Sequence, residues 1–219
     1  MGKQNIQSFI NKVICWDSLS IMKLIPDKSI DLVLTDPPYW IGMNKKFGNG
    51  QNPKMIISGD DWDLEIPPKE YFDEIFRISK NQIIWGWNYF VKYLEWKMCR
   101  LVWDKNNGES TFSDGELART SFDSALRIRK EHCTWWSMWY TEDTKGKVHP
   151  TQKPVNLMRR CLENYSEKWQ TILDPFLWSW TTAVACKELG RNFIGIEKEQ
   201  KYVDIANKRL ATTTVSLFN

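Results

Sequence analysis

Three short apolar runs, each ending in a residue that can take part in chemistry, constrain the fold of this chain more than any other feature. The runs cover residues 30–35, 171–173 and 192–196 and end in Asp36, Asp174 and Glu197. Apolar runs of this length without alternation are typical of strands buried on both faces, as in a parallel sheet. We expect further strands at residues 12–15, 82–85 and 101–103.

Helical patterns alternate with these runs. One begins at Pro154, and another covers 182–189 and stops at Gly190, a residue typical of helix C-termini. We expect further helices at 67–79, 88–96 and 202–210. Strands alternating with helices predict an α/β fold, with a doubly wound, mostly parallel sheet in one domain over 1–219. The stretch 106–148 breaks this alternation and is predicted to be an insert.

Composition excludes several classes of protein. With 42% hydrophobic and 26% charged residues, the chain is neither disordered nor a disulfide scaffold. No apolar run reaches the roughly 18 residues that a membrane span needs. The five cysteines are scattered without a C-x-x-C pair, so we expect reduced thiols, no metal site and a cytoplasmic location. A net charge of +3 is compatible with a nucleic-acid partner but too small to argue for one.

The segment Asp36-Pro37-Pro38-Tyr39 follows the first run, where open α/β sheets place their ligands. Consecutive prolines fix φ and carry no N–H, so the Asp36 side chain and the Pro37 carbonyl can project rigidly as two acceptors. Beside the flat ring of Tyr39, they suit a planar ring that bears an exocyclic amino group. Spacing alone supports a plain X-Pro-Pro turn with a capping Asp36 equally well.

Three further segments carry polar groups. In the loop after Asp174, Ser179, Thr181 and helical N–H groups suit a carboxylate. Glu197 follows about twenty residues later, where dinucleotide-type folds place an acid on a ribose diol, although a lone Glu there is more often a solvated charge. The segment 149–154 (His-Pro-Thr-Gln-Lys-Pro) precedes a helix, and the alternative for it is a plain helix-entry loop.

Together and in this order, these four segments resemble the DNA amino-methyltransferases, which methylate N6 of adenine or N4 of cytosine with S-adenosylmethionine. The resemblance covers the chain from about Val13 to Leu210 and is closest to the permuted β group. It implies the Rossmann-like fold of S-adenosylmethionine-dependent methyltransferases. Thr35 before Asp-Pro-Pro-Tyr resembles the adenine version, so we expect an adenine-N6 enzyme, with a cytosine-N4 enzyme as the alternative.

The resemblance also implies roles for individual residues. Asp36 and the Pro37 carbonyl would accept from the target amino group, Pro38 would brace them, and Tyr39 would stack on the flipped base. Glu197 would hold the cofactor ribose. The implied cofactor site as a whole comprises Asp17, Ser18, Thr151, Lys153, Asp174, Pro175, Phe176, Ser179, Thr181 and Glu197.

The partners implied are DNA, with no membrane and no metal, and the resemblance leaves open a homodimer and a companion restriction endonuclease. We expect the target sequence to be read by 106–148. That stretch contains six basic residues suited to phosphates or guanine edges, although a mixed charged loop explains any one of them: Arg119, Arg127, Arg129, Lys130, Lys145 and Lys147.

Tryptophan replaces glycine at several family positions. The cofactor loop of relatives reads D-P-F-x-G-S-G-T, whereas this chain has Trp178 and Trp180, and the same exchange affects Trp16, Trp40, Trp87 and Trp169. An indole there would cost ~1–3 kcal/mol of backbone strain and would fill the methionine pocket. Since the chain has 13 Trp and 11 Gly, our hypothesis is a lineage that reads UGA as glycine. The alternative is an inactive, nucleic-acid-binding relative.

Overall fold

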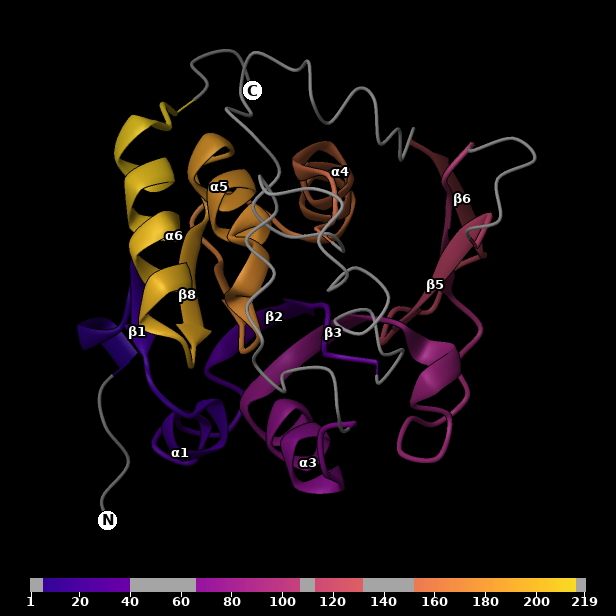
Figure 1. Ribbon diagram of the computed structural model, residues 1–219. Coiled ribbons are helices and arrows are strands. Elements are labelled where there is room, and N and C mark those ends of the chain that lie inside the picture. The colour runs from indigo at the N-terminus through magenta and orange to yellow at the C-terminus, as the bar shows by residue number, and fades with distance from the viewer. Residues whose placement is uncertain (1–5, 40–65, 107–112, 132–151, 216–219) are drawn as a thin grey trace, which may run out of the picture.

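An eight-stranded sheet runs through the computed structural model, which describes residues 6–39, 66–106, 113–131 and 152–215 (Figure 1). Within these residues the strand order is β1-β8-β7-β2-β3-β5-β4-β6. The strands are β1 Lys12–Cys15, β2 Ile30–Thr35, β3 Ser79–Trp85, β4 Arg100–Asp104, β5 Gly115–Thr120, β6 Arg127–Lys130, β7 Thr171–Asp174 and β8 Asn192–Glu197. The helices are α1 Ser18–Met22, α3 Lys69–Ile78, α4 Val155–Tyr165, α5 Thr181–Glu188 and α6 Gln200–Thr212, with 3-10 turns η1 Ile6–Ser8, η2 Trp87–Tyr89 and η4 Leu177–Ser179.

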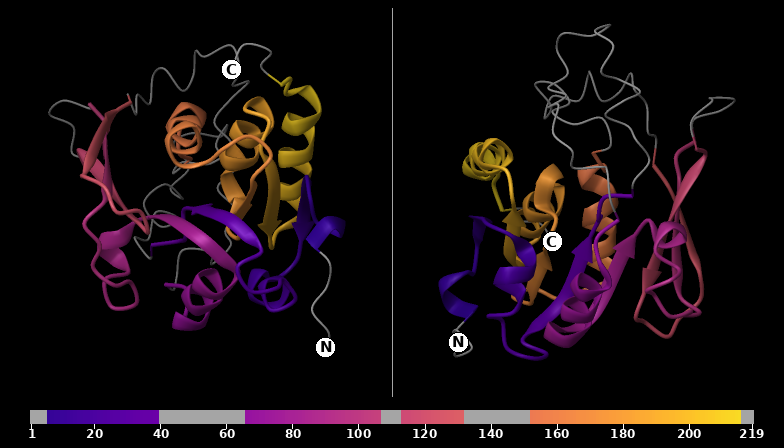
Figure 2. Two further views of the ribbon diagram at one scale, coloured as in Figure 1. Left: turned by 180° about the vertical axis from the view of Figure 1, so that it is seen from behind. Right: turned by 60° about the horizontal axis from the view of Figure 1, so that its bottom comes forward.

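Most of the sheet is parallel, as expected. The strands β1, β8, β7, β2 and β3 all pair in parallel, and so do β4 and β6. Only β5 runs antiparallel to its neighbours, β3 and β4, within the described sheet. The strands β1 and β6 therefore form opposite edges (Figure 2).

Helices cover both faces of the sheet. Helices α4, α5 and α6 lie on one face, and α1 and α3 lie on the other (Figure 1). The side chains of β2 alternate between the two cores: Leu32 and Leu34 pack with the first group of helices, and Val33 packs with the second. This confirms the doubly wound α/β fold and explains why the run 30–35 is apolar throughout.

The strand order places a topological switch point between β2 and β7. The chain continues from β2 to β3 on one side and from β7 to β8 on the other. Such a point leaves a crevice outside the carboxyl ends of the two strands, where open α/β sheets bind ligands. Asp36 follows β2 and Asp174 ends β7, so two of the predicted site segments meet there.

The predicted helix over 88–96 is wrong. The structure has only the 3-10 turn η2 and then a turn in which the Phe90 carbonyl accepts from the N–H groups of Tyr93 and Leu94. Aromatic and β-branched residues in this stretch are weak helix formers. Burial of Phe90 and Leu94 stabilises the turn instead.

The stretch 106–148 is built into the sheet where it is described. It contributes β5, which lies between β3 and β4, and β6 at the edge. Residues 107–112 and 132–148, with Lys145 and Lys147, lie outside the described residues. Its recognition role stays a prediction.

Two of the tryptophans have left-handed backbones. Trp169 has φ 68° and Trp180 has φ 47°, the region that favours glycine. Trp169 is 77% exposed, whereas Trp180 is fully buried. These values support the glycine hypothesis at two positions, and the hypothesis itself stays a proposal. Trp16, Trp87 and Trp178 do not have left-handed backbones, so the backbone strain expected at Trp178 is not found. Trp40 lies outside the described residues.

Hydropathy gives one further result. None of the helices in the described ranges combines the length and apolar character needed to cross a lipid bilayer.

Candidate active site

The segment after β2 forms a buried corner. Asp36 and Pro37 are buried, whereas Pro38 and Tyr39 are partly exposed. The Tyr39 hydroxyl donates to the Asp36 carboxylate. The Tyr39 ring lies directly against Gly86, at φ 74°, where any Cβ would overlap the ring. Glycine is therefore required at 86 both for its backbone conformation and for this approach.

The Tyr39 ring stacks on another aromatic ring. Tyr89 lies parallel to it, with 4.9 Å between centroids and 9° between planes. The Tyr89 side chain is 41% exposed. The corner therefore already holds one flat ring against Tyr39, which shows that this face of Tyr39 accepts a stacked partner.

Lys153 lies at the centre of the corner, with only 1% of its side chain exposed. Its Nζ lies 2.6 Å from Asp36 Oδ1, 2.8 Å from Glu116 Oε2 and 2.7 Å from the Tyr39 hydroxyl. Burial acts to lower the pKa of Lys153, but the two carboxylates outweigh it and raise that pKa. Lys153 is therefore a buried ammonium held by three oxygens. The resemblance implies that Lys153 lies near the cofactor, and this stays a prediction. In the structure, Lys153 contacts Asp36.

Asp36 itself titrates near neutrality. Burial raises its pKa to about 7, with Glu116 and Asp174 adding to the rise and Lys153 opposing it. A carboxyl group with this pKa changes between acceptor and donor around pH 7. Perturbed pKa values of this kind are concentrated at functional sites.

Asp174 braces the loop after β7. Its Oδ1 accepts from the Thr35 hydroxyl at 2.7 Å and from the Phe176 N–H at 3.1 Å, and its Oδ2 accepts from the Thr182 hydroxyl at 2.8 Å. Burial raises its pKa to about 6. Asp174 thus ties the ends of β2 and β7 together and anchors the start of α5.

Trp178 and Trp180 lie in this loop and point to different surroundings. The Trp178 indole N–H donates to the Asp36 carbonyl at 3.1 Å. The Trp180 ring is buried in the core with the Arg209 guanidinium 4.6 Å from its centroid. Its Nε1 has no hydrogen-bond partner among the described residues. Trp178 therefore links the loop after β7 to the corner formed by Asp36 and Tyr39.

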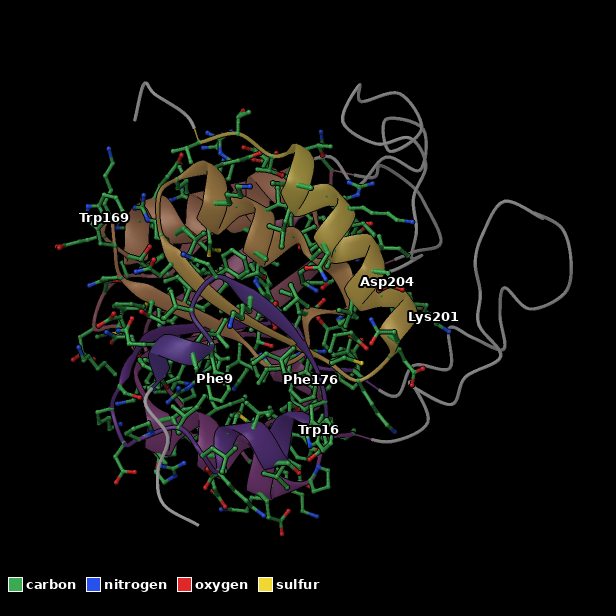
Figure 3. The ribbon with its side chains drawn as sticks, turned by 90° about the vertical axis from the view of Figure 1, so that its left-hand side faces the viewer. Phe9, Trp16, Trp169, Phe176, Lys201 and Asp204 are labelled. Carbon is green, nitrogen blue, oxygen red and sulfur yellow. The ribbon has the colours of Figure 1, made fainter. Side chains whose placement is uncertain are left out.

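Glu197 ends β8 beside the end of β1. The Trp16 N–H donates to the Glu197 carbonyl at 3.0 Å, and the Glu197 carboxylate accepts from the Glu199 N–H at 2.7 Å. Burial raises the pKa of Glu197 to about 7. Figure 3 shows Trp16 and Phe176 close together at this end of the sheet, with Trp169 at the opposite end.

Asp17 caps α1 and contacts an aromatic pair. Its Oδ1 accepts from the N–H and hydroxyl of Ser20, and its Oδ2 accepts from the Tyr71 hydroxyl at 3.0 Å. The Tyr71 ring stacks on Phe176, with 5.7 Å between centroids. Burial acts to raise the pKa of Asp17, but these hydrogen bonds lower it overall. Ser18, the first residue of α1, is buried.

The remaining predicted residues are placed as follows. Pro175 and Thr181 are buried beside Asp174 at the start of the loop and of α5. Thr151 and the side chain of Ser179 lie outside what the structure describes. Sequence reasoning missed Glu116, which joins the corner through Lys153. Glu116 lies in a strand of mixed character, Gly-Glu-Leu-Ala-Arg-Thr, which gives no pattern that marks it.

No group of His, Cys, Asp or Glu side chains in the described ranges has an arrangement that would hold a metal ion.

Comparison with known sequences identifies relatives of the whole chain. A family model described as DNA methylase matches residues 101–208. The Type II methyltransferase M.HinfI of Haemophilus influenzae is 30% identical, covering 96% of this chain and 71% of the relative. The Escherichia coli K12 protein YubD is 27% identical, covering 92% of this chain and 91% of the relative.

Solved structures show the same fold. The Thermus thermophilus protein TTHA0409 superimposes with a TM-score of 0.58 at 18% identity, covering 93% of this chain and 95% of that one. The M1.HpyAVI–SAM complex gives 0.58 at 22%, covering 90% and 98%. The cytosine-N4-specific PvuII DNA methyltransferase gives 0.55 at 15%, covering 94% and 95%.

Proposed function

Since this chain belongs to the DNA methyltransferases that act on exocyclic amino groups, we propose that it methylates N6 of adenine in DNA. The family uses S-adenosylmethionine as methyl donor, and M1.HpyAVI was solved with it. One observation carries the proposal of methyl transfer, whereas the choice of adenine rests on the resemblance of Thr35-Asp-Pro-Pro-Tyr to the adenine version of the motif. The buried Asp36 corner and the loop after β7 meet at the switch point, joined by the Thr35–Asp174 hydrogen bond.

The residues around β1, β7 and β8 suit the adenosine half of the cofactor. The Glu197 carboxylate offers acceptors for ribose hydroxyls, and the Tyr71–Phe176 pair offers an aromatic surface beside Asp17. The Trp178 indole, however, reaches the Asp36 carbonyl across the interval where the methionine half belongs by resemblance. The fit is therefore good for adenosine, and it requires either glycine at 178 or a different position of the indole.

The chain's own residues must make an aryl amine reactive. The lone pair of such an amine is delocalised into the ring, which makes the nitrogen a poor nucleophile. The Asp36 carboxylate and the Pro37 carbonyl would each accept one amino hydrogen and so localise the lone pair. This is catalysis by orientation and by placed charge.

The bound cofactor supplies an electrophilic methyl group on a sulfonium. As the nitrogen–carbon bond forms, the sulfur–carbon bond breaks and its electron pair stays on sulfur. The methylated nitrogen then loses one proton, which the Asp36 carboxylate is placed to hold. No metal and no covalent enzyme intermediate is needed for this balance.

The base must leave the duplex to reach the corner, at a cost of about a few kcal/mol. Stacking on Tyr39 would return ~1–3 kcal/mol by analogy with single-strand binders. Tyr89 occupies one face of the Tyr39 ring, so a flipped base would stack on that face only after Tyr89 has moved away. Thr35 gives its hydroxyl to Asp174, so it does not itself read adenine against cytosine.

The decisive experiment measures transfer of tritium from labelled S-adenosylmethionine into duplex DNA. Digestion to nucleosides and chromatography then separates N6-methyladenine from N4-methylcytosine. We expect label in N6-methyladenine, and none with Asp36→Ala, which should still bind the cofactor. Label in N4-methylcytosine would identify the cytosine enzyme instead. No label, even after Trp178→Gly, would favour the inactive DNA-binding relative.

A further inference from the structure

Glu116 joins the active site from a part of the chain that carries none of the family's motifs. It lies on β5, opposite Trp103 of β4, in the stretch expected to read DNA sequence. Its Oε2 lies 2.8 Å from Lys153 Nζ, and its Oε1 lies 2.8 Å from Lys105 Nζ. The Tyr39 hydroxyl is 3.5 Å away. The side chain thus faces the catalytic corner and not the solvent beyond the sheet edge.

The contacts of Lys153 explain why Glu116 matters to that corner. An ammonium has three N–H donors, and Lys153 has three oxygen neighbours, on Asp36, Glu116 and Tyr39. With 1% of its side chain exposed, Lys153 has no access to water as a substitute partner. Removing the Glu116 charge would weaken one of these three contacts, because a neutral amide oxygen attracts an ammonium less than a carboxylate does, and would let the ammonium move toward Asp36.

Charges alternate through the cluster. Lys105, Glu116, Lys153 and Asp36 form a chain of positive and negative groups, each within 2.8 Å of the next. Burial acts to raise the pKa of Glu116, but Lys153 and Lys105 outweigh it and lower that pKa. Glu116 therefore stays ionised at the pH at which Asp36 titrates.

We infer that Glu116 is a positioning residue for methyl transfer, which holds the Lys153 ammonium and through it sets the orientation and charge of the Asp36 carboxylate. This inference rests on the proposed function, in which Asp36 accepts from the target amino group. Glu116 does not touch the substrate. Its effect passes through Lys153 and Tyr39, and its negative charge acts against the ionisation of Asp36 across the corner.

The groups that face Asp36 determine whether its pKa rises or falls when the Glu116 charge is removed. Lys153 favours its ionised form, and Glu116 and Asp174 disfavour it, while the Tyr39 hydroxyl donates to it. Glu116→Gln removes one opposing charge and leaves Lys153 fully available to Asp36. The pKa of Asp36 should therefore fall, by about half a unit or more.

The test compares wild type, Glu116→Gln, Glu116→Asp and the control Glu74→Gln. Glu74 is a good match, because its side chain is 18% exposed against 21% for Glu116 and it pairs with Arg77 on α3, away from the corner. Steady-state rates are measured from pH 5 to 9 at saturating cofactor. Glu116→Gln should lower kcat roughly tenfold and move the acidic limb to lower pH, with cofactor affinity unchanged within about twofold.

Glu116→Asp keeps the charge and shortens the side chain. The acidic limb of its pH–rate profile should therefore stay at the same pH, while kcat falls. This variant also serves if Glu116→Gln fails to fold. Wild-type kcat and limb position in the Glu116 variants would overturn the inference, as would a change in cofactor affinity alone. Carboxyl ¹³C NMR of Asp36 reads the same coupling without turnover. A shifted titration in a chain that methylates no DNA would refute the proposed function and leave the coupling intact.

Discussion

The Trp178 indole N–H donates a hydrogen bond to the Asp36 backbone carbonyl at 3.1 Å. The two residues are separated by 142 positions in the chain. The indole thus bridges the two segments that we propose to hold the cofactor and the target base.

Replacing Trp178 with glycine should strengthen cofactor binding, because the indole of the unaltered chain must move aside before the methionine half can bind. The change removes the bridging indole and leaves the Asp174 brace and the Glu197 end of the site untouched. We expect at least a tenfold gain in S-adenosylmethionine affinity by isothermal titration calorimetry. Trp96→Gly, which removes an exposed indole elsewhere, is the control. Micromolar binding by the unaltered chain would show that the indole does not obstruct the site.

Trp169 and Trp180 should respond in opposite ways to glycine. Both have left-handed backbones, so glycine relieves strain of about 1–2 kcal/mol at each. Trp169 is 77% exposed and loses little packing, so Trp169→Gly should raise the free energy of unfolding by about 0.5–1 kcal/mol. Trp180 is fully buried, and losing its ring costs about 3–5 kcal/mol, so Trp180→Gly should be destabilising.

Urea unfolding of both variants gives the comparison. A loss of stability in Trp169→Gly would contradict the strain argument. The origin of the tryptophans is tested in the coding DNA, where TGG at codons 16, 87, 178 and 180 would end the glycine hypothesis and TGA is the result that it expects.

Methyl transfer should fall in acid because Asp36 must accept a hydrogen bond. Its pKa is raised to about 7, so below that pH the protonated carboxyl becomes a donor and kcat should drop about tenfold per unit. Burial raises the pKa of Glu197 to about 7 as well, but our proposal gives this residue a role in cofactor binding. Measuring kcat at saturating cofactor separates the two groups. A flat profile from pH 5 to 8 would exclude an ionised Asp36 as the acceptor.

Glu197→Gln should stabilise the cofactor-free protein at neutral pH. Burial raises the pKa of Glu197 to about 7, so the folded state binds a proton more tightly than the unfolded state. Its contribution to stability is therefore greatest in acid and declines between about pH 4.5 and 7, on the order of 1–3 kcal/mol. Glutamine keeps an acceptor for the Glu199 N–H and has no charge to bury.

Thermal melts at pH 4.5 and 8 should show a gain for Glu197→Gln only at pH 8, together with weaker cofactor binding. Glu163→Gln, at a partly exposed carboxylate on α4, is the control. Equal melting temperatures for wild type and variant at pH 8 would mean that the carboxylate is not penalised by burial.

Sequence patterns predicted the parallel part of the sheet because its strands are apolar on both faces. The strands Lys12–Cys15 and Ile30–Thr35 have the expected bounds, and Pro154 and Gly190 flank α4 and α5 as their chemistry indicates. The strands β5 and β6 were not predictable in the same way. They carry charged residues, whose positions are fixed by partners distant in sequence.

The candidate site likewise contains residues that the sequence predicted and residues that it did not. Asp36, Tyr39 and Lys153 lie together in the structure, and all three belong to short motifs. Glu116 lies in none, and its importance arises from the placement of β5 between β3 and β4. Tyr71 and Tyr89 likewise reach the site through tertiary contacts, which a pattern along the chain does not contain.

The Thr35–Asp174 hydrogen bond joins residues 139 positions apart. Neither half of the chain holds a rudimentary version of the site, since each contributes one wall and the sheet supplies the alignment. Methyl transfer therefore requires the complete fold. Selection for DNA methylation would at the same time preserve the residues that stabilise the whole sheet.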